Sequence, residues 1–254
     1  MQSATYVYGV ALAQPFDTGN PPLTVSGIGG SGGVRTIVLR DLVAVVSDVP
    51  EFRLDLTREN LLAHQRVLEE VLNRSDVLPF SFGAIASSDD EVREVLLRDA
   101  YDALQEQLDY VRGCVELEVK AFWDEERLFA EIAEENADVR ALRDTIAMLP
   151  EEAGASERIT LGQLIEAEIE SKSEWESDGV LDFLEPHAVE LLVSPNLTNT
   201  MVVNAAFLVD RAREQEFDDA VAVLAAEQSG RLIFNYVGPL APYSFVNLVF
   251  GTEE

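Results

Sequence analysis

Two kinds of apolar periodicity alternate along this chain, and this alternation limits its fold more than any other feature of the sequence. Short runs are apolar nearly throughout or alternate apolar with polar residues, as β-strands do, whereas longer segments repeat apolar residues every three or four positions, as amphipathic helices do. A strand-like run at residues 6–12 opens the series, and another at 231–237 lies near its end. Strands interspersed with helices in this way predict the α+β class.

The first part of the pattern predicts an N-terminal α+β domain over residues 1–113. Its expected elements are strands at 6–12, 34–39 and 42–46, a helix at 57–73, a strand at 76–86 and a helix from 88 to 112. Thr57 is a suitable N-cap for the first helix, and Ser88 with Glu91 forms a capping box for the second. Pro79 has no N–H to donate, so its strand is expected at a sheet edge. Gly113 fits the residue that follows a helix C-terminus and marks the boundary.

The remainder predicts a C-terminal domain over residues 114–254. Its expected elements are a strand at 114–122, a helical insertion at about 124–190, a strand at 201–209, a helix at 211–228 and a strand at 231–237. Within the insertion, Thr160 and Gln163 match a capping box and predict that a helix begins there. This order of elements predicts a ferredoxin-like domain. Each of the two domains is thus expected to pack helices on a small mixed sheet.

Charge excludes one class of partner. The chain has 47 Asp and Glu against 18 Lys and Arg, which gives a formal net charge of −29. Binding to nucleic acid depends on Lys and Arg that displace condensed counterions, so this chain would be repelled by a phosphate backbone. An anionic membrane surface is disfavoured for the same reason.

The acidic residues also predict the solvent for which the chain is adapted. They are spread through the apolar-periodic segments, and only two of the basic residues are lysines, Lys120 and Lys172. In molar salt the Debye length falls to about 3 Å, so the repulsion between surface carboxylates is screened. We therefore expect a halophilic protein that needs high salt to stay folded.

The sequence offers no grouping that predicts catalytic, metal-binding or cofactor-binding residues. His64 lies on the apolar stripe of the helix at 57–73, and no second His or Cys stands at metal-ligand spacing, so a packed or hydrogen-bonded imidazole is expected. Cys114 occupies a strand-like run without the basic neighbours that activate a thiol. The glycine-rich segment at 27–33 lacks the Gly-Lys-Ser/Thr of a phosphate-binding loop and is expected to be a plain loop. We therefore predict that the protein is not an enzyme.

Location is predicted from what the sequence lacks. No apolar stretch approaches the roughly 18 residues needed to span a bilayer, so membrane insertion is not expected. No basic segment precedes the first apolar run, as it would in a signal peptide. Since Cys114 is the single cysteine, an intramolecular disulfide is impossible. We expect a cytoplasmic protein.

Four blocks of sequence, in order along the chain, carry a resemblance to a known family. They are Tyr-Val-Tyr-Gly-Val at 6–10; His64-Gln65 followed by Val-Leu-Pro-Phe-Ser-Phe-Gly at 77–83; Val-Glu-Leu-Glu-Val-Lys at 115–120; and the stretches at 204–209 and 236–246. With these blocks the chain resembles the gas vesicle protein F/L family. Ser81 stands where a basic residue is common in the family, and the glycine-rich insertion is rather long.

The resemblance implies a two-domain α+β accessory protein, chaperone-like, that is associated with gas vesicles and acts during their assembly. Its implied partners are the hydrophobic shell protein and other gas vesicle accessory proteins. An apolar shell subunit would aggregate in water unless its surface were covered before it enters the wall. The alternative is a small-molecule-binding regulatory module built on the ferredoxin-like domain, an idea that rests on fold analogy alone.

Two of the family blocks supply candidate partner-binding residues. Exposed aromatic and proline side chains could act there as anchors for a partner. The alternative is that the same residues are core and turn residues, because aromatic residues beside strands usually pack inward. The candidates are Pro79, Phe80, Phe82, Pro242, Tyr243 and Phe245.

Overall fold

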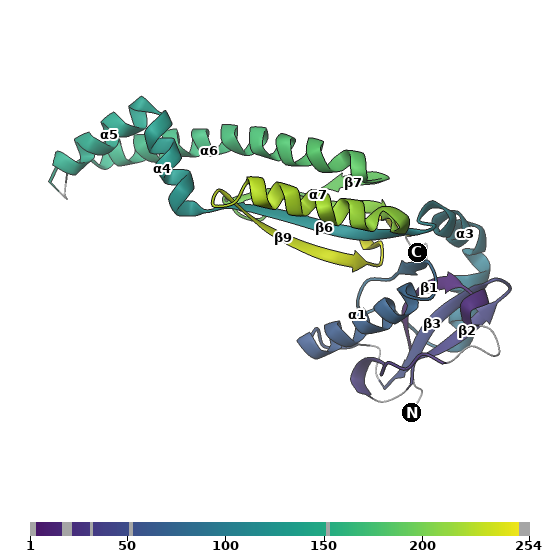
Figure 1. The fold of residues 1–254 in the computed structure, drawn as a ribbon. Coiled ribbons are helices and arrows are strands. Elements are labelled where there is room, and N and C mark those ends of the chain that lie inside the picture. Colours follow the sequence, from purple (N-terminus) through teal and green to yellow (C-terminus); the bar gives the residue numbers. More distant parts are fainter. Residues whose placement is uncertain (1–3, 17–21, 31–32, 51–52, 151–152, 249–254) are drawn as a thin grey trace. The chain divides into compact units, whose positions relative to one another are not determined.

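A computed structural model of the chain describes residues 4–16, 22–30, 33–50, 53–150 and 153–248. The chain divides into two compact units, one formed by Met1–Glu116 with Gly238–Glu254 and the other by Leu117–Val237 (Figure 1). The chain first passes from one unit to the other between Glu116 and Leu117, close to the boundary expected at Gly113. Gly238–Glu254 was expected to belong with residues 114–237 but groups with the first unit instead.

The first unit is built on an antiparallel sheet. Its strands are β1 (Ala4–Leu12), β2 (Arg35–Leu39), β3 (Leu42–Val49), β4 (Val77–Pro79) and β5 (Ile85–Ala86). They are ordered β2-β3-β1-β4, and β5 also pairs with β1. Its described strand pairs are all antiparallel, so the prediction of a mixed sheet is wrong for this unit. Between β2 and β3 the reason is local, because a link of only two residues, Arg40 and Asp41, can join neighbouring strands only as a hairpin. Gly9 is required in β1 because a Cβ there would lie 2.5 Å from the carbonyl oxygen of Leu78.

Helices cover both faces of this sheet (Figure 1). They are α1 (Arg58–Leu72) on one face and α2 (Asp89–Glu91), the π-helical segment η3 (Val92–Asp99) and α3 (Tyr101–Tyr110) on the other. The predicted N-caps are confirmed: the hydroxyl of Thr57 accepts from the N–H of Asn60 at 3.2 Å, and that of Ser88 accepts from the N–H of Glu91 at 3.2 Å. The second bond of the predicted capping box differs, because the carboxylate of Glu91 accepts from the N–H of Ser87 at 2.6 Å. Gly113 follows α3 with a positive φ of 70°, as expected for a residue after a helix C-terminus.

The strand expected at 76–86 is wrong as a single element. β4 ends at Pro79 and β5 begins at Ile85, so the intervening residues form a loop. Pro79 lacks the N–H that would continue the ladder, which explains the break. The edge position of β4 is confirmed by the strand order.

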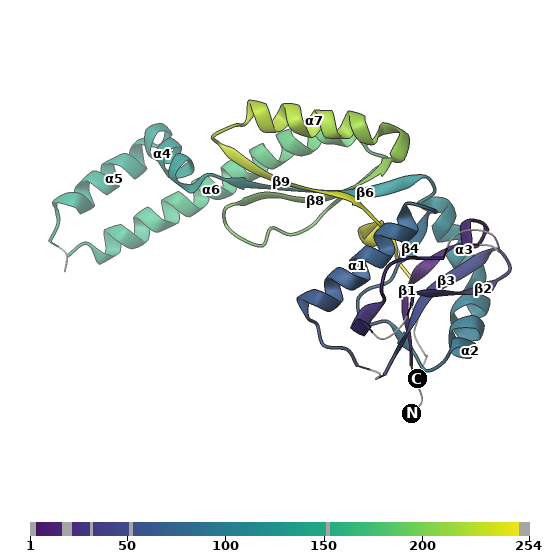
Figure 2. The same cartoon turned by 60° about the horizontal axis from the view of Figure 1, so that its bottom comes forward.

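The second unit contains the other sheet. Its strands are β6 (Cys114–Trp123), β7 (Glu190–Val193), β8 (Met201–Asp210) and β9 (Leu232–Leu240), in the order β7-β8-β6-β9. Its helices are α4 (Glu125–Glu135), α5 (Ala137–Met148), α6 (Ala155–Leu184) and α7 (Glu214–Glu227). With α4, α5 and α6 counted as one helical segment, the elements follow one another as β-α-β-β-α-β, the order from which a ferredoxin-like domain was expected. Helices α6 and α7 contact each other and β8, so they lie on one face of the sheet (Figure 2).

The helical insertion differs from the sequence prediction. Residues 155–184 form one continuous helix, so the helix start expected at Thr160 and the separate helical piece expected at 180–187 are both wrong. Thr160 lies inside α6, where its hydroxyl donates to the carbonyl of Ser156 at 3.0 Å and so bonds within the helix instead of capping a helix start. Strand β7 was not foreseen.

Short 3-10 turns complete the description: η1 (Gln14–Phe16), η2 (Ile28–Gly30), η4 (Glu185–His187), η5 (Arg211–Arg213) and η6 (Tyr243–Phe245). Of the glycine-rich segment expected to be a loop, residues 31–32 lie outside the described residues. Cys114 lies at the start of β6, which confirms the predicted strand position, and it is buried there.

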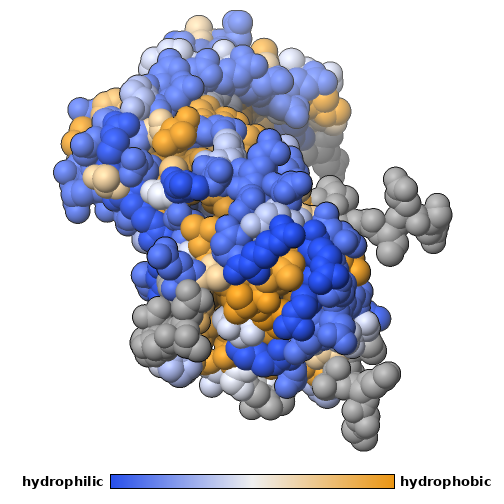
Figure 3. All heavy atoms as spheres, turned by 90° about the vertical axis from the view of Figure 1, so that its right-hand side faces the viewer, coloured by the Kyte–Doolittle hydropathy of each residue, from blue (hydrophilic) through white to orange (hydrophobic). Residues whose placement is uncertain are grey.

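Figure 3 shows one face of the molecule, on which hydrophilic residues predominate and apolar residues occupy smaller areas between them. None of the helices in the described ranges combines the length and apolarity that crossing a bilayer requires.

Candidate functional site

A cluster of aromatic side chains lies between β1 and α1 in the first unit. Tyr6 and Tyr8 are two residues apart on β1, so their side chains lie on the same face of the sheet, the face that α1 covers. His64 of α1 stacks on Tyr8, with ring centroids 5.6 Å apart, and its edge meets the ring of Tyr6 at 5.7 Å. Phe82, from the loop after β4, and Tyr243 of η6 lie at 6.1 and 6.4 Å from the His64 ring. Residues far apart in sequence thus surround one imidazole.

Hydrogen bonds fix that imidazole on both sides. Nδ1 of His64 lies 2.9 Å from the hydroxyl of Tyr6, and Nε2 lies 2.9 Å from the hydroxyl of Tyr243. A neutral imidazole has one N–H and one lone pair, so the ring donates from one nitrogen and accepts at the other. Tyr6 also accepts from the N–H of Gly83 at 3.2 Å, which places Phe82 beside the cluster.

The electrostatics of this cluster favour uncharged groups. His64 is 4% exposed, and burial lowers its pKa from 6.5 to about 4, against a smaller opposing effect of a hydrogen bond with the backbone of Phe80. Burial likewise raises the pKa of Tyr6 and of Tyr243 well above the ordinary value of 10. All three side chains are therefore neutral near pH 7. The hydrogen-bonded imidazole predicted from the sequence is confirmed.

An apolar groove lies next to this cluster, and both of its walls belong to the first unit. It has a volume of about 560 Å³. One wall is the loop from Pro79 to Ala84, and the other is formed by Tyr243, Val246 and Leu248. The amide of Phe80 donates to the carbonyl of Tyr8 at 2.9 Å, which holds the loop against β1.

The structure brings together four of the six candidate partner-binding residues. Pro79, Phe80, Phe82 and Tyr243 all line the groove. Phe80 and Phe82 are half-buried and Tyr243 is 38% exposed, whereas Pro79 is buried. Pro242 is buried and Phe245 is only 5% exposed, and neither lines the groove. The accessible candidates are therefore Phe80, Phe82 and Tyr243.

Sequence reasoning missed the residues that hold the C-terminal wall in place. Glu116 on β6 is fully buried, and its two carboxylate oxygens accept from the N–H and the hydroxyl of Ser244, each at 2.7 Å. Together with the bond between Tyr243 and His64, this pair ties the segment after β9 to the first unit. The alternation of β6 would have placed Glu116 on the face of Glu118 and Lys120, and nothing in the sequence marks it as buried.

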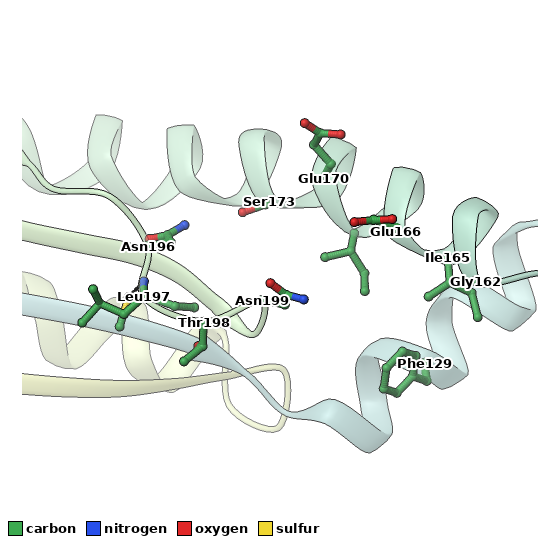
Figure 4. A pocket seen from close by; sticks show the side chains of 12 residues that line it. Phe129, Gly162, Ile165, Glu166, Glu170, Ser173, Asn196, Leu197, Thr198 and Asn199 are labelled. Carbon is green, nitrogen blue, oxygen red and sulfur yellow. Dashed lines mark hydrogen bonds between the residues drawn. The ribbon is translucent and has the colours of Figure 1, made fainter. Parts of the chain in front are cut away.

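A larger pocket lies in the second unit, with a volume of about 700 Å³ (Figure 4). Phe129 of α4, Glu166 and Glu170 of α6, and the loop from Asn196 to Asn199 contribute to its lining. Its lining residues include these two glutamates but no histidine, cysteine, lysine or arginine, so it does not pair an acid with a base. Within the described ranges, no group of three or more His, Cys, Asp and Glu is arranged to hold a metal ion.

The fold and the groove define the class: this is a two-unit α+β protein with an apolar surface groove built around a buried, neutral histidine. The chain belongs to the gas vesicle synthesis protein GvpL/GvpF family, whose family model matches residues 4–247. The resemblance found in the sequence is thereby confirmed.

Relatives match along nearly the whole chain. Gas vesicle protein F of a Streptomyces species is 32% identical over 248 residues, covering 96% of this chain and 99% of the relative. Gas vesicle protein F of Haloferax mediterranei is 29% identical, covering 100% of this chain and 98% of the relative. A gas vesicle protein L from Streptomyces is also 29% identical, over 270 residues.

Solved structures agree with this assignment. The crystal structure of the gas vesicle protein GvpF from Anabaena has a TM-score of 0.81 at 28% identity, covering 97% of this chain and 99% of that one. The GvpF structure from Microcystis aeruginosa gives a TM-score of 0.76 at 27% identity, covering 96% and 99%. The α+β fold is confirmed, and the chain has a role related to gas vesicles.

Proposed function

We propose that this protein is a non-enzymatic, cytoplasmic accessory factor that binds the hydrophobic gas vesicle shell protein, other minor gas vesicle proteins, or both, during vesicle formation. One observation carries the proposal: two segments about 160 residues apart converge on a single apolar groove beside a buried cluster. Half-buried aromatic side chains around such a groove are suited to anchor an apolar partner.

The electrostatics of the site support binding over catalysis. A general acid or base works best with a pKa near the operating pH. The pKa of His64 lies near 4 and both tyrosines have raised pKa values, so this cluster holds no group poised for proton transfer at pH 7. Its hydrogen bonds instead fix the two walls of the groove.

A pull-down from cells that produce the tagged chain together with the shell protein, carried out in molar salt, tests the proposal. We expect Phe80→Ala and Phe82→Ala each to reduce at least tenfold the shell protein captured by the folded fraction, in addition to any fall in the unfolding midpoint, because both rings also pack against the first unit. Phe129→Ala, at a 47% exposed aromatic residue outside the groove, is the matched control and is expected to bind normally.

Two outcomes would contradict the proposal. If the wild-type chain captures neither shell protein nor any other gas vesicle protein, the binding function is wrong. If Phe80→Ala and Phe82→Ala lower the unfolding midpoint and leave capture by the folded fraction intact, both residues are core residues and the groove is not the contact surface.

A further inference from the structure

Strand β9 forms one edge of the second sheet, because β6 is its single strand neighbour in the described sheet order. It has nine residues, whereas β7 at the other edge has four, and β2 at the edge of the first sheet has five. An edge strand leaves a row of backbone N–H and C=O groups without ladder partners. Pro239 has no N–H and cannot donate to an added strand. The part of β9 that can pair with another strand is therefore residues 232–237, which precede it.

The chemistry of this edge is unusual for such an acidic chain. Charged residues make up 26% of the sequence, so about two would be expected among nine residues, yet β9 contains none. Tyr236 points to α7, where its ring lies 6.1 Å from that of Phe217. Ile233 and Val237 therefore point to the opposite face of the sheet, and they are 57% and 40% exposed. Natural edge strands usually carry charges that prevent pairing, and β9 lacks this protection.

We infer that the free edge of β9 receives an extended, uncharged segment of the shell protein as an additional strand. This inference rests on the proposed function and deepens it by naming the mode of recognition. Backbone hydrogen bonds would supply affinity, and apolar side chains at alternate positions of the partner would cover Ile233 and Val237. A charged side chain beside them would lose hydration without gaining a counter-charge, which selects an uncharged segment.

A second copy of this chain is the competing occupant, and charge argues against it. In molar salt, two such chains repel each other only where docking brings their carboxylates within the Debye length of about 3 Å, but an interface between two acidic surfaces does this, whereas an uncharged segment meets no such repulsion.

The test uses the full chain, with the same pull-down of co-produced shell protein in molar salt. The variant Ile233→Lys with Val237→Lys places two charges on the edge and is expected to capture at least tenfold less shell protein. The matched control, Val193→Lys with Val223→Lys, adds the same charge at two positions of the same unit that are 58% and 47% exposed, and it should bind normally. Circular dichroism shows whether each variant is folded.

Hydrogen exchange on the wild-type chain gives a second readout that does not depend on the variants. Amides within residues 232–237 are expected to exchange at least tenfold more slowly when the shell protein is bound. Unchanged exchange there, or normal capture by the edge variant, would overturn the inference while leaving the proposed function intact. Loss of capture by the wild-type chain itself would instead reject the proposed function, and this inference with it.

Sedimentation of the chain alone in molar salt examines the competing occupant. A monomer is the expected result. A wild-type dimer that becomes monomeric in the edge variant would assign the edge to a second copy and overturn the inference.

Discussion

His64 is held by neutral tyrosine hydroxyls on both sides of its ring, and this arrangement makes the first unit sensitive to acid. The pKa of His64 is about 4 in the folded chain, against an ordinary value of 6.5. Between these values the unfolded chain takes up a proton that the folded chain does not, so the free energy of unfolding falls as the pH is lowered. The difference corresponds to about 3 kcal/mol once the pH is below 4.

The variant His64→Gln removes this titration and keeps a side chain with both a donor and an acceptor. We expect the free energy of unfolding, measured with denaturant in molar salt, to decrease less between pH 7 and pH 4.5 in the variant than in the wild type. His187→Gln, which removes the only other histidine of the sequence, is measured beside it for comparison. Equal slopes for the wild type and His64→Gln would show that His64 is not responsible.

Ser244 is a second residue whose effect is predicted from its contacts. Its N–H and hydroxyl both donate to the fully buried carboxylate of Glu116. Removing a donor to a buried carboxylate costs about 1–3 kcal/mol, so Ser244→Ala should lower the free energy of unfolding by that amount. Ser171→Ala, at an exposed position of α6, is the control and should change stability by less than about 0.5 kcal/mol. A neutral effect of Ser244→Ala would mean that the C-terminal wall is held by other contacts.

At the scale of elements, Arg231 connects the start of β9 to helices α4 and α6 in the second unit. Arg231, just before β9, bonds Glu131 of α4 at 3.0 Å and Glu176 of α6 at 2.5 Å. The carboxylate of Glu176 is 4% exposed, and hydrogen bonding to Arg231 lowers the pKa of Glu131.

Replacing Arg231 with Gln would leave the buried carboxylate of Glu176 without its counter-charge. Breaking a buried ion pair in this way costs about 3–5 kcal/mol, and we expect a loss near the lower end because Arg231 is itself 31% exposed. Arg213→Gln is the control, since its pair with Glu216 is 43% and 61% exposed and should contribute less than about 1 kcal/mol. Denaturant unfolding of both variants in the same salt compares the two effects. Equal, small losses would reject a structural role for this network.

Elements with strong local signals were predictable from the sequence. Strands β1, β3 and β8 are long apolar runs, and α1 combines a clear apolar stripe with a cap at Thr57, so local chemistry defines them. Thr160 shows the limit of such signals, because its capping pattern lies in the middle of a helix. Strand β7 has only four residues and is defined by its pairing with β8, which no local pattern reveals.

The candidate site shows a different limit. The sequence indicated the aromatic residues on both sides of the groove, but not that the two segments meet. Their meeting depends on the bond between Tyr243 and His64, 179 positions apart, and on the bond between Ser244 and the buried carboxylate of Glu116, 128 positions apart. Burial of Pro242 and Phe245 likewise follows from tertiary packing, since their neighbours in sequence give no sign of it.

At the scale of the whole molecule, the excess of acidic residues sets the condition for stability. Most ion pairs in the described residues are at least partly exposed. These pairs involve only a fraction of the 47 acidic side chains of the sequence. The remaining carboxylates repel one another across a folded surface more strongly than across an expanded chain. The Debye length is about 3 Å in 1 M salt but about 30 Å at 10 mM, so dilution of the salt restores this repulsion over most of each unit.

We therefore expect the chain to be folded in molar salt and to unfold or expand on dilution into millimolar salt, as measured by far-UV circular dichroism and by the hydrodynamic radius. Sucrose also stabilises folded proteins, through exclusion from their surface, but it does not screen charge. Potassium chloride should thus restore the folded signal at low protein concentration, whereas sucrose at the same osmolality should restore much less of it. A spectrum and a hydrodynamic radius that are unchanged between molar and millimolar salt would show that self-repulsion at this net charge is too weak to overcome the stability that the hydrophobic cores provide. Equal rescue by sucrose would assign the salt effect to solute exclusion and not to screening.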